Sequence, residues 1–145
     1  MTRAAIDPRD RLFAVLDDQA AVEHATEALQ SIGIADRDIE VLAGSSAADG
    51  FDGTGAVHGP LARIRRAFEF SLADQMPDLA WYEAALREGR FVVGVRTRDA
   101  ATTRRAVAGL TGAGGHFINR FGRLQTEEYA RWRGREPDVH VLLRR

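Results

Sequence analysis

A pattern of residues occurs twice in the chain, and this repeat restricts the possible folds more than any other feature. Each copy holds an apolar segment typical of a buried strand, an acidic residue, an amphipathic helix that ends near Leu and Gly, and a second apolar segment. The first copy spans residues 11–44 and the second spans residues 90–121. Because crossovers between parallel strands are right-handed, each copy predicts a βαβ unit with its two strands parallel in one sheet. Two such units predict an α+β, ferredoxin-like fold, with a four-stranded sheet and helices on one face.

The ends of the two predicted helices have specific signals. Asp17 or Asp18 can cap the first helix and Asp99 the second, because a carboxylate accepts hydrogen bonds from the free N–H groups of the first turn. Gly33 is expected to end the first helix in the left-handed conformation, and the glycines around Gly114 are expected to end the second. These signals define the boundaries of both predicted helices.

A long insertion, residues 45–89, separates the two units. It is about ten times longer than the four to six residues that usually connect such elements. A glycine-rich loop over residues 44–59 leads into Pro60, and the apolar spacing predicts a helix over residues 61–72. A second helix is predicted from Pro77 to the end of the insertion. Long loops often hold functional groups, so we expect a specific site here.

Polar side chains near the start of the first inserted helix are candidates for binding an anion. The imidazole of His58 can donate a hydrogen bond to a ligand or shuttle a proton, and Arg63 and Arg66 can hold a phosphate or carboxylate. Asp52 lies in a glycine-rich run that lacks the lysine of a phosphate loop and the spacing of a calcium loop. The alternatives are a turn-rich connector and a histidine that bonds to a backbone carbonyl.

Two adjacent aromatic residues in the second inserted helix are candidates for a flat ligand. On a helix, Trp81 and Tyr82 point about 100° apart, so we expect one to pack and the other to face a pocket or a partner. With Phe68 and Phe70 they can wall a site for a flat ligand such as haem, with His58 as the axial base. Core packing is the simpler alternative. The histidines are too scattered for a metal site, and no serine or acidic pair has the spacing of a hydrolase.

The residue types that are missing exclude several functions. The chain has no cysteine and no lysine, which excludes disulfides, thiolate catalysis, Cys-bound zinc and Schiff-base chemistry. Its 20 basic residues, all arginine, nearly balance 21 acidic residues, so we do not expect nucleic-acid binding driven by bulk charge. A local arginine face can still contact phosphates, or it is a solvated face with ion pairs; it consists of Arg96, Arg98, Arg104 and Arg105.

The nearly even total charge conceals an asymmetry along the chain. Residues 1–86 contain seven Arg and fifteen Asp or Glu, whereas residues 87–145 contain thirteen Arg and six Asp or Glu. We therefore expect the two parts to attract each other.

The C-terminal part, residues 122–145, predicts two further elements. A short helix is predicted over residues 127–134, with Tyr129 and Trp132 on one side, and a tail strand over residues 138–143. A tail strand without a partner pairs with an exposed sheet edge or with a second subunit, so we expect a homodimer.

The length and hydropathy of the chain predict one domain over residues 1–145. Its 145 residues, 45% of them hydrophobic, are ordinary for a single globular domain. No apolar run approaches the roughly 18 residues of a membrane span, and the first ten residues lack an apolar signal segment. We therefore expect a cytoplasmic protein that does not bind a membrane.

Three segments share a pattern with a known family: residues 29–34 together with 39–42, residues 81–95, and residues 110–116. The second contains Tyr-x-x-Ala-Leu-x-x-Gly-x-x-Val-Val-x-Val from Tyr82 onward. On these residues the chain resembles general stress protein 17M-like domains, the heat-induced stress proteins of the YflT type, over about residues 11–121. The resemblance implies a small cytoplasmic stress-related module with no established catalytic residues.

We therefore expect a stress-associated, non-enzymatic binding or interaction module for a small anionic or flat aromatic ligand. The candidate ligand-binding residues are His58, Arg63, Arg66, Tyr82, Asp52 and Trp81. The alternative is an enzyme of the dimeric α+β-barrel type, either haem-dependent or a cofactor-free monooxygenase. No catalytic residue and no metal ligand is predicted.

Overall fold

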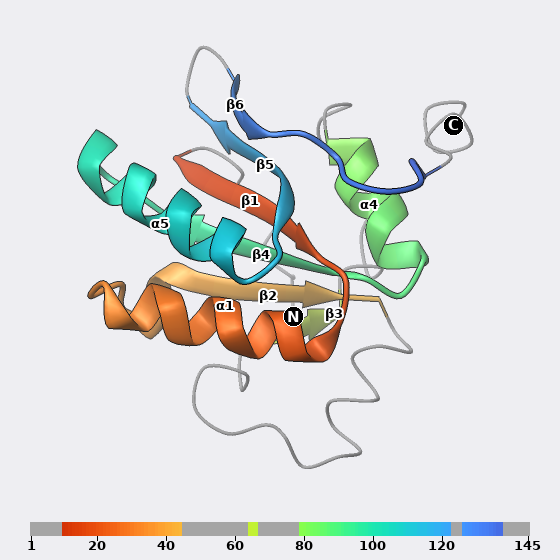
Figure 1. Cartoon of the computed structure of the whole chain (residues 1–145), viewed down its shortest axis with the longest axis horizontal. Helices are drawn as coiled ribbons and strands as arrows, with labels where there is room; N and C mark the ends of the chain where they lie inside the picture. The colour runs from red at the N-terminus through yellow and green to blue at the C-terminus, as the bar shows by residue number, and fades with distance from the viewer. Residues whose placement is uncertain (1–9, 45–63, 67–78, 123–125, 138–145) are drawn as a thin grey trace, which may run out of the picture.

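The structure is a computed structural model that describes residues 10–44, 64–66, 79–122 and 126–137. At its centre is a six-stranded sheet in the order β3-β2-β4-β1-β5-β6, with helices packed against it (Figure 1). The strands are β1 (Arg11–Leu16), β2 (Ile39–Ala43), β3 (Ile64–Arg66), β4 (Phe91–Arg96), β5 (His116–Phe121) and β6 (Thr126–Ala130). The helices are α1 (Gln19–Ser31), the short 3₁₀ helix η1 (Asp36–Asp38), α4 (Ala80–Arg87) and α5 (Ala100–Gly112).

The strands of the two predicted units alternate in the sheet. β4 lies between β1 and β2 and is antiparallel to both. β1 in turn lies between β4 and β5 and is antiparallel to both. The two strands of each unit are therefore parallel, as predicted, but one strand of the other unit separates them. The α+β class is confirmed, and the strand order is compatible with the predicted ferredoxin-like arrangement.

Helices cover both faces of the sheet (Figure 1). On one face, Leu29 of α1 and Leu110 of α5 belong to a buried cluster with Leu12 of β1. On the other face, Tyr82 of α4 belongs to a second buried cluster with Phe13 of β1. Leu12 and Phe13 serve different faces because successive side chains of a strand point to opposite sides. The helices of the two units thus share one face, as predicted, and the inserted helix α4 covers the other.

The predicted helix ends are present. The carboxylate of Asp18 accepts a hydrogen bond of 2.8 Å from the N–H of Ala21 and caps α1, and Asp99 caps α5 in the same way. Gly33 has a φ angle of 91°, in the left-handed region that favours glycine, and it follows the end of α1. Of the two candidate caps for α1, Asp17 is therefore not the one used.

Two predicted helices are corrected by the structure. Within residues 61–72, Ile64–Arg66 form β3, which pairs in parallel with β2. In place of a helix over residues 127–134, Thr126–Ala130 form β6, which pairs with β5. In both places the edge of a neighbouring strand offers backbone N–H and C=O groups, and strand pairing satisfies them. The predicted tail strand over residues 138–143 lies outside the described residues.

Among the described residues, several ion pairs join the acidic first part of the chain to the basic second part, in line with the expected attraction. They include Arg90 with Asp17, Arg98 with Asp38, and Arg120 with Asp10. Among the described helices, none has the length and apolar character that crossing a bilayer requires.

Candidate functional site

The structure places three of the predicted ligand-binding residues and not the other three. His58, Arg63 and Asp52 lie outside the described residues, so their predicted role stays a prediction. Arg66 is the last residue of β3, at one edge of the sheet. Trp81 and Tyr82 both lie on α4.

Tyr82 is a core residue whose polar group is fully used within the fold. Its side chain is 1% exposed, and its hydroxyl lies 2.8 Å from the carbonyl oxygen of Phe117. The side-chain amide of Asn119 donates a hydrogen bond of 2.9 Å to the same hydroxyl. Burial raises the pKa of the Tyr82 phenol, which therefore stays protonated and able to donate. Tyr82 therefore offers no surface to a ligand. It packs in the core, which was the simpler alternative to ligand binding.

Trp81 is also engaged within the fold. Its ring is stacked on Phe117, with ring centroids 5.2 Å apart and an interplanar angle of 22°, and the ring of Trp132 lies 5.8 Å away. The expectation that one of the two adjacent aromatic residues packs and the other faces outward is met only in part. Tyr82 packs wholly and Trp81 packs in part.

Arginine side chains gather instead around a hollow of about 290 Å³ beyond the end of β4, which we call the arginine hollow. Its cationic residues are Arg37 of η1, Arg96 at the end of β4, and Arg98 in the connection to α5. Strand pairing brings them together: Ile39 at the start of β2 is opposite Val95 of β4. The turn that precedes β2 therefore lies beside the residues that end β4 and follow it.

The remaining residues that line the arginine hollow are neutral or acidic. It consists of Gly33, Ile34, Ala35, Asp38, Asp99 and Thr102. Hydrogen bonds from the backbone N–H and the hydroxyl of Thr102 hold the pKa of the Asp99 carboxyl below its usual range. Asp99 is thus an ionised helix cap, already bonded, and does not neutralise the arginines directly.

Two of the three arginines have no acidic partner in the part of the chain that the structure describes. Arg37 and Arg96 are exposed and take part in no ion pair there. Arg98 does have a partner, because its Nη1 lies 3.2 Å from Oδ2 of Asp38. The arginine hollow therefore presents guanidinium groups whose charge is not balanced by contact with a carboxylate.

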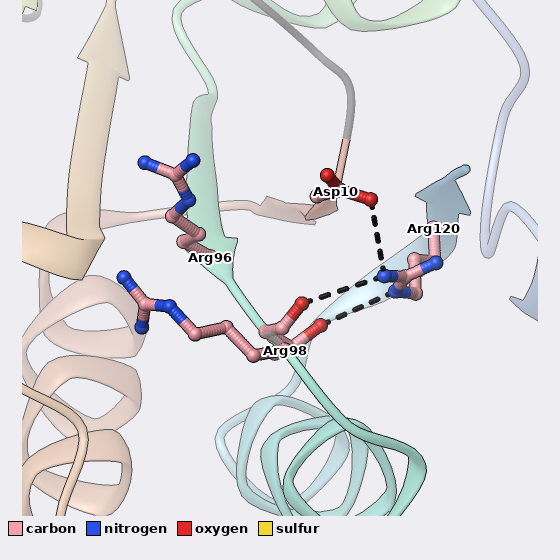
Figure 2. Close-up of a pocket in the computed structure, with 5 residues that line it drawn as sticks. Asp10, Arg96, Arg98 and Arg120 are labelled. Atoms are coloured by element: carbon pink, nitrogen blue, oxygen red, sulfur yellow. Dashed lines mark hydrogen bonds and ion pairs between the residues drawn. The ribbon is translucent and has the colours of Figure 1, made fainter. Parts of the chain in front are cut away.

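A second, smaller hollow of about 200 Å³ adjoins the first and includes Arg120 (Figure 2). Arg120 is committed to the fold: it donates to the hydroxyl and the carbonyl oxygen of Thr97, and its Nη2 lies 3.5 Å from Oδ1 of Asp10. Figure 2 shows the guanidinium groups of Arg96 and Arg98 extending together to one side, away from Arg120. Arg96 and Arg98 are thus the available cations, and Arg120 is a structural one.

The sequence identified two of these residues and missed two others. Arg96 and Arg98 belong to the predicted arginine face, although the two arginines grouped with them lie on α5 and do not line either hollow. Arg37 and Arg120 were not singled out. No local pattern marks them, since only the pairing of β2 with β4 and of β1 with β5 brings them near the end of β4.

A further polar cluster lies at the opposite end of β4. Nε2 of His116 lies 2.8 Å from the Asp17 carboxylate, and the backbone N–H of Arg133 donates to Nδ1 at 3.1 Å. Because a backbone N–H can only donate, Nδ1 is the acceptor and Nε2 holds the proton in the neutral ring. Burial raises the pKa of Asp17, but hydrogen bonds from His116 and Arg90 outweigh it and lower that pKa overall. Both ring nitrogens are occupied, so His116 fastens the segment after β6 and has no free nitrogen for proton transfer.

The described residues contain no group of three or more side chains positioned to hold a metal ion. His58, the predicted axial base for haem, lies outside them. Comparison with protein-family models, with curated proteins and with solved structures finds no match to this chain. The family resemblance therefore stays a prediction, and function has to be inferred from the side chains themselves.

Proposed function

We propose that this protein is a non-enzymatic binding module for a small anionic ligand, and that the arginine hollow is its binding site. The observation behind the proposal is that Arg37 and Arg96 face one hollow with no acidic partner among the described residues. Arg98, tied to Asp38 by one exposed ion pair, adds a third guanidinium. Exposed cations that no described carboxylate neutralises favour an anion from the solvent.

Guanidinium groups suit this role because of their geometry. Each presents N–H donors in a planar fork that matches two oxygens of a carboxylate or a phosphate. The hollow is open and its arginines are exposed, so water screens each contact and each contributes only modestly. We therefore expect a dissociation constant of about 0.1 to 1 mM for inorganic phosphate at low salt.

The non-enzymatic part of the proposal rests on how the polar groups in the hollow are used. Asp99 and Thr102 are bonded to each other at the start of α5, and Asp38 accepts from Arg98. None of them faces the hollow as a free general base or activated nucleophile. Binding is thus the activity that the described lining supports.

The other expectations stay predictions. Stress association and a cytoplasmic location follow from the family resemblance and from sequence composition, and a homodimer follows from the tail strand. A flat aromatic ligand and the haem-dependent or monooxygenase alternative depend on residues that are outside the described part or are packed within it.

Isothermal titration with inorganic phosphate tests the proposal, at about 20 mM sodium chloride so that screening stays weak. We expect Arg96→Ala to weaken phosphate binding about fivefold. The matched control is Arg104→Ala, since Arg104 is an exposed arginine of α5 that does not line the hollow. Equal losses in both variants would show that net charge alone attracts phosphate. Absence of phosphate binding by the unmodified protein would reject the proposed function.

A further inference from the structure

We propose that Asp38 is a built-in competitor of the ligand: it holds Arg98 in the empty site and releases it when an oxyanion binds. This inference rests on the proposed function, because it concerns how the same arginine hollow is regulated. The two residues line that hollow together, and their ion pair is the only contact between an arginine of the hollow and a carboxylate among the described residues.

The two partners differ in how firmly they are held. The side chain of Asp38 is 12% exposed and belongs to η1, directly before β2, so the sheet fixes its position. The side chain of Arg98 is 63% exposed and belongs to the connection after β4. Arg98 is therefore the partner that moves, since a long exposed side chain changes rotamer easily. Figure 2 shows that its guanidinium already lies on the same side as that of Arg96.

The geometry of the Arg98–Asp38 pair keeps the free energy needed to separate it low. Arg98 makes a single contact of 3.2 Å with Asp38, through Nη1 alone, and not the two parallel bonds of a bidentate pair. An exposed pair of this kind contributes little to stability. A ligand with two terminal oxygens can offer Arg98 the bidentate contact that Asp38 does not, and can bond to Arg96 at the same time.

The geometry therefore points to a ligand class as well as to a regulatory residue. Oxyanions with two or more terminal oxygens, such as phosphate or carboxylate groups, can displace Asp38 from Arg98. A chloride ion offers a single acceptor atom and only one negative charge, so it competes with Asp38 less well than a phosphate with two or more terminal oxygens. Asp38 lowers the apparent affinity for an oxyanion, because only the molecules in which Arg98 is free can make this contact at once.

The test compares two variants that change net charge equally. Asp38→Asn removes the competitor, whereas Asp36→Asn removes a carboxylate of the same turn that does not line the hollow and instead accepts from Gln30. We expect Asp38→Asn to bind inorganic phosphate about threefold to fivefold more tightly than the unmodified protein. Asp36→Asn should change the phosphate affinity by less than about 1.5-fold at about 150 mM salt, because its effect is long-range and screened.

A double-mutant cycle assigns the gain to Arg98. In the Arg98→Ala background, the gain in phosphate affinity from Asp38→Asn should be clearly smaller, because only the lost charge repulsion remains and no Arg98 side chain is left to release. Equal gains for Asp38→Asn and Asp36→Asn, or a gain of the same size without Arg98, would overturn the inference and leave the proposed function standing. If neither the unmodified protein nor Asp38→Asn binds phosphate, the proposed function fails and the inference fails with it. Thermal unfolding of each variant checks that the fold is intact.

Discussion

The hydroxyl of Tyr82 on α4 lies 2.8 Å from the carbonyl oxygen of Phe117 in β5 and thereby joins the inserted helix to a bulge in the sheet. The register of β1 with β5 shifts between Phe13 and Val15, opposite this point. Phe117 has a φ angle of 47°, which bulky residues rarely adopt. Its N–H donates to the carbonyl oxygen of Arg131 at 3.0 Å, so both backbone groups of the strained residue are bonded.

Replacement of Tyr82 by Phe should destabilise the protein by about 1 to 3 kcal/mol, since it leaves the buried amide of Asn119 and the Phe117 carbonyl without this partner. Urea denaturation measures the change. Tyr129→Phe is the control, because Tyr129 is 39% exposed and its hydroxyl donates to Glu127 in a solvent-exposed contact. The control should change stability by less than about 0.5 kcal/mol. Similar small changes in both variants would contradict a structural role for the Tyr82 hydroxyl.

Gly115 follows α5 at a point where no side chain fits. A Cβ atom there would lie 2.7 Å from the carbonyl oxygen of Leu110, which is backbone and cannot move aside easily. Gly115→Ala should therefore cost about 1 to 3 kcal/mol of unfolding free energy. Gly112→Ala, three residues earlier, meets nothing within 4 Å and should be neutral or slightly stabilising. Thermal unfolding of the two variants side by side measures the difference, and equal melting temperatures would refute the predicted clash.

The helix cap Asp99 should make stability depend on pH in the acid range. Its pKa in the folded protein lies below the ordinary value of 3.8, so the cap stabilises the fold fully above that value. This contribution is lost as the pH falls below 3.8 and through the lower folded pKa. The unmodified protein should thus be more stable than Asp99→Asn at neutral pH, and the difference should vanish in strong acid. Denaturation curves at several pH values measure this difference in unfolding free energy. A difference that is constant with pH would contradict the prediction.

The hydroxyl of Thr102 provides a second check on the same carboxylate. It donates to Oδ2 of Asp99 at 3.0 Å, in addition to the backbone bond from the same residue. In Thr102→Val the backbone bond remains and the hydroxyl bond is lost, so the pKa of Asp99 should rise part of the way toward 3.8. A carboxyl NMR titration reports this pKa directly, and an unchanged value would exclude the hydroxyl as a cause of the shift.

His116 should control the protection of the segment that follows β6. In His116→Phe, the backbone N–H of Arg133 loses its acceptor, and its hydrogen exchange should become about tenfold faster or more. His24 is an exposed histidine of α1, so His24→Phe should leave the exchange of Arg133 unchanged. If Arg133 exchanges at the same rate in both variants, the imidazole does not fasten this segment.

Sequence reasoning succeeded where the determining signals are local. Asp18, Gly33 and Asp99 lie next to the helix ends that they define, and their chemistry acts over three or four residues. It failed for β3 and β6, because the secondary structure of a three- or five-residue segment depends on which strand it lies beside in the folded protein. The same limit applies to the site. Arg96 and Arg98 are neighbours in the sequence, whereas Arg37 reaches them only through the register of β2 with β4.

The alternation of strands in the sheet has a consequence for how the chain can be divided. A chain cut between residues 86 and 87 would leave the first fragment with β1 and β2 about 10 Å apart, two strand spacings, and without the backbone partner that lies between them. The second fragment would lack β1 between β4 and β5 in the same way. Each fragment supplies the strand that the other lacks, and the opposite net charges of the two fragments favour their association. Two separately expressed fragments should therefore fold only when mixed, as a reconstituted pair.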